Sequence, residues 1–182
     1  MKKLFIILVT LMVISSCATT KEAKLARIED RKEKKIAEQA SVKDAVESKR
    51  FIIKFDRIYF TRGGIADLVP TANYLIIDGD KAIINTAYVG RQYDIWPIMA
   101  INMKGKSLNY AVKKISSRGI YEIKMDVTNG KSANFDIYLS IGESGACNVS
   151  VSSLRIDNVN YSGHIVPIEP KKVVEDQKGV MI

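Results

Sequence analysis

The segment YEIKMDVTNGKSANFDIYLSI (residues 121–141) indicates the fold class of this chain. Apolar side chains recur at every second position in both halves, at Tyr121, Ile123, Met125, Val127, Phe135, Ile137, Leu139 and Ile141. A period of two is typical of a β-strand that buries one of its faces. Asn129-Gly130 stands between the halves and is a favoured pair for a type I′ turn. We therefore predict an antiparallel hairpin with one polar face.

Similar alternation continues on both sides of this hairpin. Strand-like stretches occupy residues 50–60, 74–84, 98–103, 108–116, 146–153 and 158–168. Asp78-Gly79 divides one of these stretches into a second short hairpin. Sustained alternation with one polar face favours antiparallel pairing, because parallel strands are usually covered on both faces. The expected fold class is mainly β, an antiparallel sandwich or barrel of about eight or nine strands preceded by an N-terminal helix.

The start of the chain has the layout of an export signal. Two lysines precede an apolar run at residues 4–14, and two serines separate that run from Cys17. A helix needs roughly 20 apolar residues to cross a bilayer, so this shorter run is typical of a secretory signal peptide. The quartet ISSC (residues 14–17) resembles the lipobox of bacterial lipoproteins. The resemblance implies cleavage before Cys17 and a lipid on its sulfur; the alternative is an ordinary signal peptide with a chance cysteine.

These signals predict four regions along the chain. Residues 1–16 are the signal peptide, and residues 17–35 are the lipid anchor and a charged stalk. Residues 36–168 are a helix and the β-domain, and residues 169–182 are a loose tail. Residues 21–49 contain no Gly or Pro and favour a helix whose second half docks on the domain. A disordered tether and a coiled coil are the alternatives for the stalk.

Composition argues against several classes of function. The chain has 28 Lys and Arg against 20 Asp and Glu, and the excess is spread along it rather than gathered into a nucleic-acid-binding stripe. No phosphate-binding loop or dinucleotide fingerprint is present, and His164 is the single histidine, so we expect no metal and no cofactor. Cys147 shares strand parity with Val149, which predicts a buried and inert thiol.

Two loops carry candidate binding residues. The first, AYVGRQYDIWPIM (residues 87–99), holds Tyr88, Arg91, Tyr93, Asp94 and Trp96. Aromatic rings with an arginine suit recognition of a partner. In the structural alternative Arg91 pairs with Asp94 while Trp96 covers one end of the sheet. The second loop, IYFTRGGIADLVP (residues 58–70), holds Tyr59, Phe60 and Arg62.

Several segments, in order, resemble a family. ESKRFIIKFDRIY, NYLIIDGDKAI, AYVGRQY, YEIKMDV and YSGHIVPI are similar to segments of an uncharacterised family of Bacteroidetes lipoproteins, over about residues 36–168. Tyr88-x-Gly90-Arg91-x-Tyr93 is the most recognisable piece. Those proteins have one domain of unknown function behind a lipobox and a charged helix. The resemblance implies a cell-envelope location and a β-rich domain, but no activity. Residues 18–21 lack the acidic cluster of surface-displayed lipoproteins, which favours an outer-membrane anchor facing the periplasm.

The function expected from these observations is a non-catalytic cell-envelope lipoprotein that binds a partner. The partner is an envelope protein or a glycan, and the membrane contact is the lipid on Cys17. The alternative is a carrier of a small apolar ligand in a barrel or sandwich cavity. A carboxylate-dependent hydrolase is a weaker alternative, because no catalytic constellation is evident in the sequence.

Overall fold

A computed structural model describes residues 2–60, 63–90, 100–130 and 134–168, with side chains from residue 23 onward. The chain forms two compact units, Met1–Ala40 and Ser41–Ile182. Helix α1 (Lys2–Glu47) forms the first unit as far as Ala40, and its last seven residues belong to the second unit. Within the described part of α1, the side chains of Leu25, Ile28 and Ile36 are exposed. No helix among the described residues is long and apolar enough to cross a membrane.

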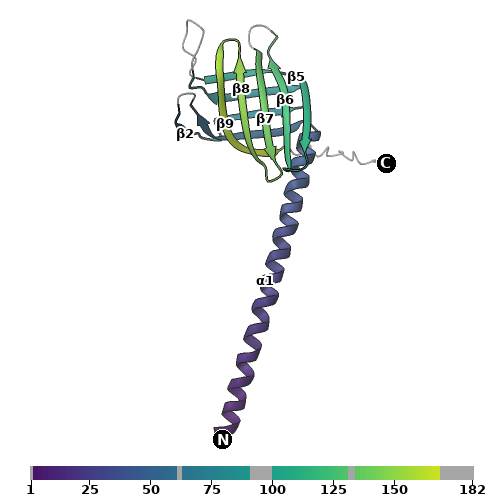
Figure 1. Cartoon of the computed structure of the whole chain (residues 1–182), viewed down its shortest axis with the longest axis vertical. Helices are drawn as coiled ribbons and strands as arrows, with labels where there is room; N and C mark the ends of the chain where they lie inside the picture. The colour runs from purple at the N-terminus through teal and green to yellow at the C-terminus, as the bar shows by residue number, and fades with distance from the viewer. Residues whose placement is uncertain (1, 61–62, 91–99, 131–133, 169–182) are drawn as a thin grey trace, which may run out of the picture. The chain divides into compact units, whose positions relative to one another are not determined.

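The second unit is an antiparallel β-structure (Figure 1). Its described strands are β1 (Arg50–Tyr59), β2 (Ile65–Asp67), β3 (Tyr74–Asp78), β4 (Lys81–Ala87), β5 (Ala100–Ile115), β6 (Ile120–Thr128), β7 (Asn134–Gly142), β8 (Ala146–Ser153) and β9 (Ile156–Pro167). Strands β3 to β9 pair in sequence order, each antiparallel to the next. The predicted fold class, mainly β with an N-terminal helix, is confirmed.

Pairing of β1 with β9 closes the sheet into a barrel. Phe51 of β1 stands opposite Pro167, and the pairing runs to Tyr59 opposite Asn160. On its other edge, β1 pairs first with β3 and then, at its C-terminal end, with the short strand β2. Among the described strands, eight therefore form a closed antiparallel barrel and β2 is an additional strand. Of the two predicted architectures, sandwich and barrel, the structure has the barrel.

Strand β5 passes from one layer of the barrel to the other. Its first half pairs with β4 up to Lys106, and its second half pairs with β6 from Lys106 onward. Gly105 stands at this transition, where a Cβ atom would collide with the carbonyl oxygen of Thr128. Figure 1 shows β6, β7, β8 and β9 crossing in front of the other strands. The two strand-like stretches 98–103 and 108–116 thus contribute to one long strand rather than to two.

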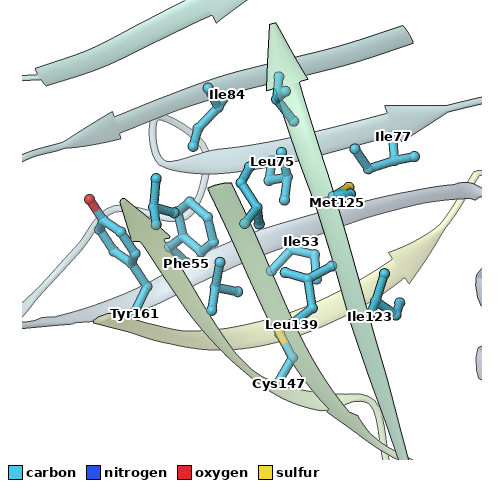
Figure 2. Close-up of a cluster of buried hydrophobic side chains, with 14 of the residues drawn as sticks. Ile53, Phe55, Leu75, Ile77, Ile84, Ile123, Met125, Leu139, Cys147 and Tyr161 are labelled. Atoms are coloured by element: carbon cyan, nitrogen blue, oxygen red, sulfur yellow. The ribbon is translucent and has the colours of Figure 1, made fainter. Parts of the chain in front are cut away.

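Side chains fill the middle of the barrel. Figure 2 shows Phe55, Tyr161 and Met125 among the residues that point into a common interior from different strands. The rings of Phe55 and Tyr161 stack with their centroids 4.7 Å apart. The hydroxyl of Tyr161 donates a 2.9 Å hydrogen bond to the carbonyl oxygen of Ala87, so this polar atom is satisfied within the core.

The last turns of α1 cover one end of the barrel. Val42, Ala45 and Val46 are buried there in the same hydrophobic cluster as the strands. Docking of the second half of the predicted helix is therefore confirmed for these residues, whereas Ile36 has 65% of its surface exposed. At the opposite end of the barrel, β4, β6 and β8 end and β5, β7 and β9 begin.

The predicted two-residue turn at Asn129-Gly130 is wrong. Thr128 pairs with Asn134, so five residues connect β6 to β7. Gly130 does adopt a positive φ of 75°, and its N–H donates to the hydroxyl of Thr128. In the second predicted hairpin, Asp78 pairs with Lys81, and Gly79 has a positive φ of 64°. The two glycine-containing pairs therefore predicted where the chain reverses direction, but they did not predict the length of the β6–β7 loop.

Candidate functional site

A cleft of about 410 Å³ lies at the end of the barrel opposite the last turns of α1. It lies where the first half of β5 diverges from β6 and β7, and the β8–β9 turn borders it. The described residues that line it are Ala100, Ile101, Asn102, Met103, Asn129, Asn134, Phe135, Ser153, Leu154, Arg155 and Ile156. This volume is within the range of ligand-binding pockets.

The floor of the cleft is apolar. Ile101, Met103 and Ile156 are buried, and Phe135 packs against the core. These side chains belong to three strands that are far apart in the sequence, β5, β7 and β9. The floor is therefore the end of the barrel core, and it offers apolar surface to a bound group.

The rim of the cleft is rich in amides, although the exposed side chain of Leu154 also borders it. Asn102, Asn129 and Asn134 stand on it together with Ser153 and Arg155. In the described part of the chain, no hydrogen bond engages the side-chain amide of Asn102 or Asn134. An amide group both donates and accepts hydrogen bonds, so the rim can hold a neutral polar group of a ligand.

Most of the first predicted binding loop lies outside the described residues. This is so for Arg91, Tyr93, Asp94 and Trp96. Tyr88 is described, and only 2% of its surface is exposed, so its ring belongs to the barrel core. The loop rejoins the described structure at Ala100, on the edge of the cleft.

The described residues of the second predicted loop lie in two different environments. Phe60 is partly buried against the core, whereas Tyr59 faces outward at the end of β1. The hydroxyl of Tyr59 lies 3.2 Å from the hydroxyl oxygen of Ser162 on β9. Arg62 lies outside the described residues. The structure thus does not bring Tyr59 and Phe60 together into one binding surface.

Cys147 and His164 have the surroundings expected of structural residues. Cys147 is buried, and that burial, followed by the nearby charge of Asp56, raises the pKa of its thiol to about 12 despite an opposing hydrogen bond from Gly163. A nucleophilic cysteine needs the thiolate, which this environment disfavours. His164 is exposed, with its Nδ1 atom 3.1 Å from a carboxylate oxygen of Asp56. Among the described residues, no group of three His, Cys, Asp or Glu side chains is placed to bind a metal ion.

The cleft residues were not among the predicted site residues. They come from strand ends on β5, β7 and β9 and from the two turns between them, which sequence spacing does not connect. One local signal was available, since Asn102, Asn129 and Asn134 all stand at or beside the end of a predicted strand. That signal alone did not distinguish a binding rim from ordinary loop asparagines.

Comparison with known proteins identifies the family and the fold. The model of a domain of unknown function, DUF4251, matches residues 33–165. The crystal structure of a DUF4251 family protein from Bacteroides eggerthii DSM 20697 is similar, with a TM-score of 0.60 and 15% sequence identity. The match covers 73% of this chain and 91% of that one, and it supports the same fold. None of the curated proteins matches the chain. The chain belongs to the DUF4251 family.

Proposed function

We propose that this protein is a non-catalytic binding module of the bacterial cell envelope. The lipid on Cys17 anchors it to the outer membrane, and the barrel faces the periplasm. The cleft at the open end of the barrel receives an amphiphilic ligand, or an amphiphilic group of a partner, with its apolar part on the floor and its polar part on the rim. The observation that carries this proposal is the cleft itself, with Met103 and Phe135 on its floor and Asn102 and Asn134 on its rim.

The position of the cleft defines what kind of carrier the barrel could be. The described interior is filled by side chains such as Phe55 and Tyr161, and the last turn of α1 covers the closed end. A small apolar ligand enclosed at the centre would have to displace this packing, which is costly in a close-packed core. Space is available instead in the cleft at the open end of the barrel, where the apolar floor meets the rim. If the protein carries a small ligand, that ligand therefore binds in the cleft at the open end and not inside the barrel.

The envelope part of the proposal rests on the sequence. The short apolar run before Cys17 is typical of export, and the ISSC quartet resembles a lipobox. A lipid anchor with two or more acyl chains holds a protein stably on a membrane, whereas one chain gives only reversible binding. No feature of the described residues favours the hydrolase alternative.

Native mass spectrometry of the full chain tests both parts of the proposal. The protein is extracted from its own host's envelope in mild detergent and is never refolded. We expect the covalent mass of residues 17–182 plus lipid, together with a non-covalent mass that is lost on mild activation. An unmodified Cys17 would contradict the anchor, and a bare chain without any adduct would contradict a retained cleft ligand.

A matched pair of variants locates the ligand. Ala100 and Ala111 are both exposed alanines of β5, but only Ala100 lines the cleft. Ala100→Trp should fill the cleft and abolish the adduct, whereas Ala111→Trp should retain it. Equal loss or equal retention in both variants would show that the adduct binds elsewhere.

A further inference from the structure

The outer face of β7, β8, β9 and β1 carries two rows of polar residues, of which all but one are uncharged. The strand registers align Tyr138, Ser150, Asn160 and Tyr59 in one row across the four strands. They align Ser140, Asn148, Ser162 and Arg57 in the next. All but Arg57 are tyrosine, serine or asparagine. The single charge, on Arg57, is paired with Asp67 at 3.2 Å.

The surface over these two rows has two depressions rather than being flat. A depression of about 400 Å³ is lined by side chains of the first row together with Ser140 and Asn148. A second depression of about 440 Å³ is lined by residues of β1, β8 and β9, namely Asp56, Arg57, Ala146, Cys147, Asn148, Ser162 and Gly163. The two depressions share Asn148 and are neighbours; the first, which no charged residue lines, is called the trough. Side-chain size accounts for the first depression, because the smaller side chains of Ser150 and Asn160 lie between Tyr138 and Tyr59.

Two side-chain amides of the trough are available for a ligand. In the described structure, no hydrogen bond engages the side-chain amides of Asn148 and Asn160. Ser150 and Tyr59 bond within or beside the trough, to Asn158 and Ser162. Each free amide supplies two N–H donors and a carbonyl acceptor to the solvent side.

The two tyrosines mark the ends of the first row. Tyr138 has 41% of its surface exposed, and Tyr59 is partly exposed. Three strand spacings separate them, which corresponds to about 14 Å. A tyrosine ring offers an apolar face next to a polar hydroxyl, and this suits ligands that have both kinds of surface.

We propose that this trough binds a neutral glycan chain. Sugar rings present hydroxyl groups that match asparagine and serine, and C–H faces that pack against tyrosine rings. The lining of the trough carries no charge to compensate an anionic polymer, and its amide and hydroxyl groups would be left without hydrogen-bond partners under an apolar peptide segment. This site is on the outside of the barrel and is independent of the cleft at the mouth.

Binding of defined oligosaccharides to the full chain in mild detergent tests the proposal. The probes are the neutral hexasaccharides of the cello-, xylo-, manno- and malto- series, with hexagalacturonate as the anionic control, and titration calorimetry is the measurement. We expect saturable binding of at least one neutral probe and none of hexagalacturonate. Failure of all four neutral probes, or preference for the anionic one, would overturn the proposal.

Variants assign the binding to the trough. Tyr138→Ala and Asn148→Ala should each lower the affinity about tenfold or more, because they remove a ring face and a central amide. Tyr74→Ala is the matched control, since Tyr74 is a partly exposed tyrosine of β3 away from these rows. Thermal melting identifies any variant that fails to fold. Binding that survives both trough substitutions, or that falls equally in the Tyr74→Ala control, would overturn the assignment.

Discussion

The hydroxyl group of Tyr110 on β5 donates a 2.9 Å hydrogen bond to the backbone carbonyl oxygen of Val46 in α1. The same carbonyl accepts the N–H of Lys49 at 3.3 Å, and the ammonium group of Lys49 lies 4.9 Å from the centre of the Tyr110 ring. The last carbonyl groups of a helix have no partner within the helix. Tyr110 therefore stabilises the end of α1 where it covers the barrel.

Replacing Tyr110 with phenylalanine should destabilise the barrel modestly. The ring and its packing remain, while one hydrogen bond to Val46 is lost, which corresponds to about 1 kcal/mol. The backbone N–H of Lys49 still donates to the carbonyl oxygen of Val46, so a larger loss of stability is not expected. Urea unfolding of Tyr110→Phe against the parent protein measures the difference. A free energy of unfolding equal to that of the parent would show that the contact contributes nothing.

Glycine at position 163 is required for barrel closure. A Cβ atom there would collide with the carbonyl oxygen of Lys54 and lie 3.1 Å from the Cα atom of Phe55, on the opposite strand of the closing pair. Gly163→Ala should therefore lower the free energy of unfolding by more than about 2 kcal/mol.

Gly142→Ala is the control for this substitution, measured by the same urea titration. A Cβ atom on Gly142 would meet nothing closer than 3.6 Å. If both alanine variants were equally stable, close approach at the β1–β9 pairing would not be what requires glycine.

Tyr161 should make stability fall at alkaline pH. Burial, and to a smaller extent Tyr88, raises the pKa of Tyr161 above its ordinary value of 10, against an opposing hydrogen bond with Thr86. The unfolded chain releases this proton near pH 10 while the folded chain retains it, so stability is present below pH 10 and is lost as pH rises beyond it.

Urea unfolding at several pH values between 9 and about 11.5 tests this effect. The free energy of unfolding of Tyr161→Phe should fall less steeply above pH 10 than that of the parent protein, because phenylalanine has no proton to release. Parallel slopes would mean that the Tyr161 hydroxyl titrates normally in the folded state.

Cys147 should be unreactive while the protein is folded. Its thiol is buried in the interior cluster, and burial raises its pKa to about 12 (Figure 2). In a Cys17→Ser background, Cys147 is the only thiol. A disulfide reagent at pH 8 should modify it at least about a hundredfold faster in denaturant than in the folded state, since reaction requires an exposed thiolate. Similar rates in both conditions would contradict the burial of Cys147.

Local patterns in the sequence predicted the strands and their faces well. Tyr121, Ile123, Met125 and Val127 are all buried, as their alternation indicated. The connection after Thr128 was predicted less well, because Asn129-Gly130 reports a reversal but not the number of residues that complete it. Tyr88 lay in a segment with the composition of a binding loop, yet its ring belongs to the core. Composition does not reveal which way a side chain points near the end of a strand.

The amino-acid sequence by itself determined the strand-forming segments, the side chains that each strand buries and the helix before them. These properties depend on residues within a few positions of one another, because side chains alternate along each strand. Only the tertiary structure decided the closure of β1 on β9, which joins Phe51 to Pro167, and the passage of β5 between layers. The mouth cleft and the tyrosine-bounded trough follow from those pairings, since their residues meet only after strands distant in sequence lie side by side.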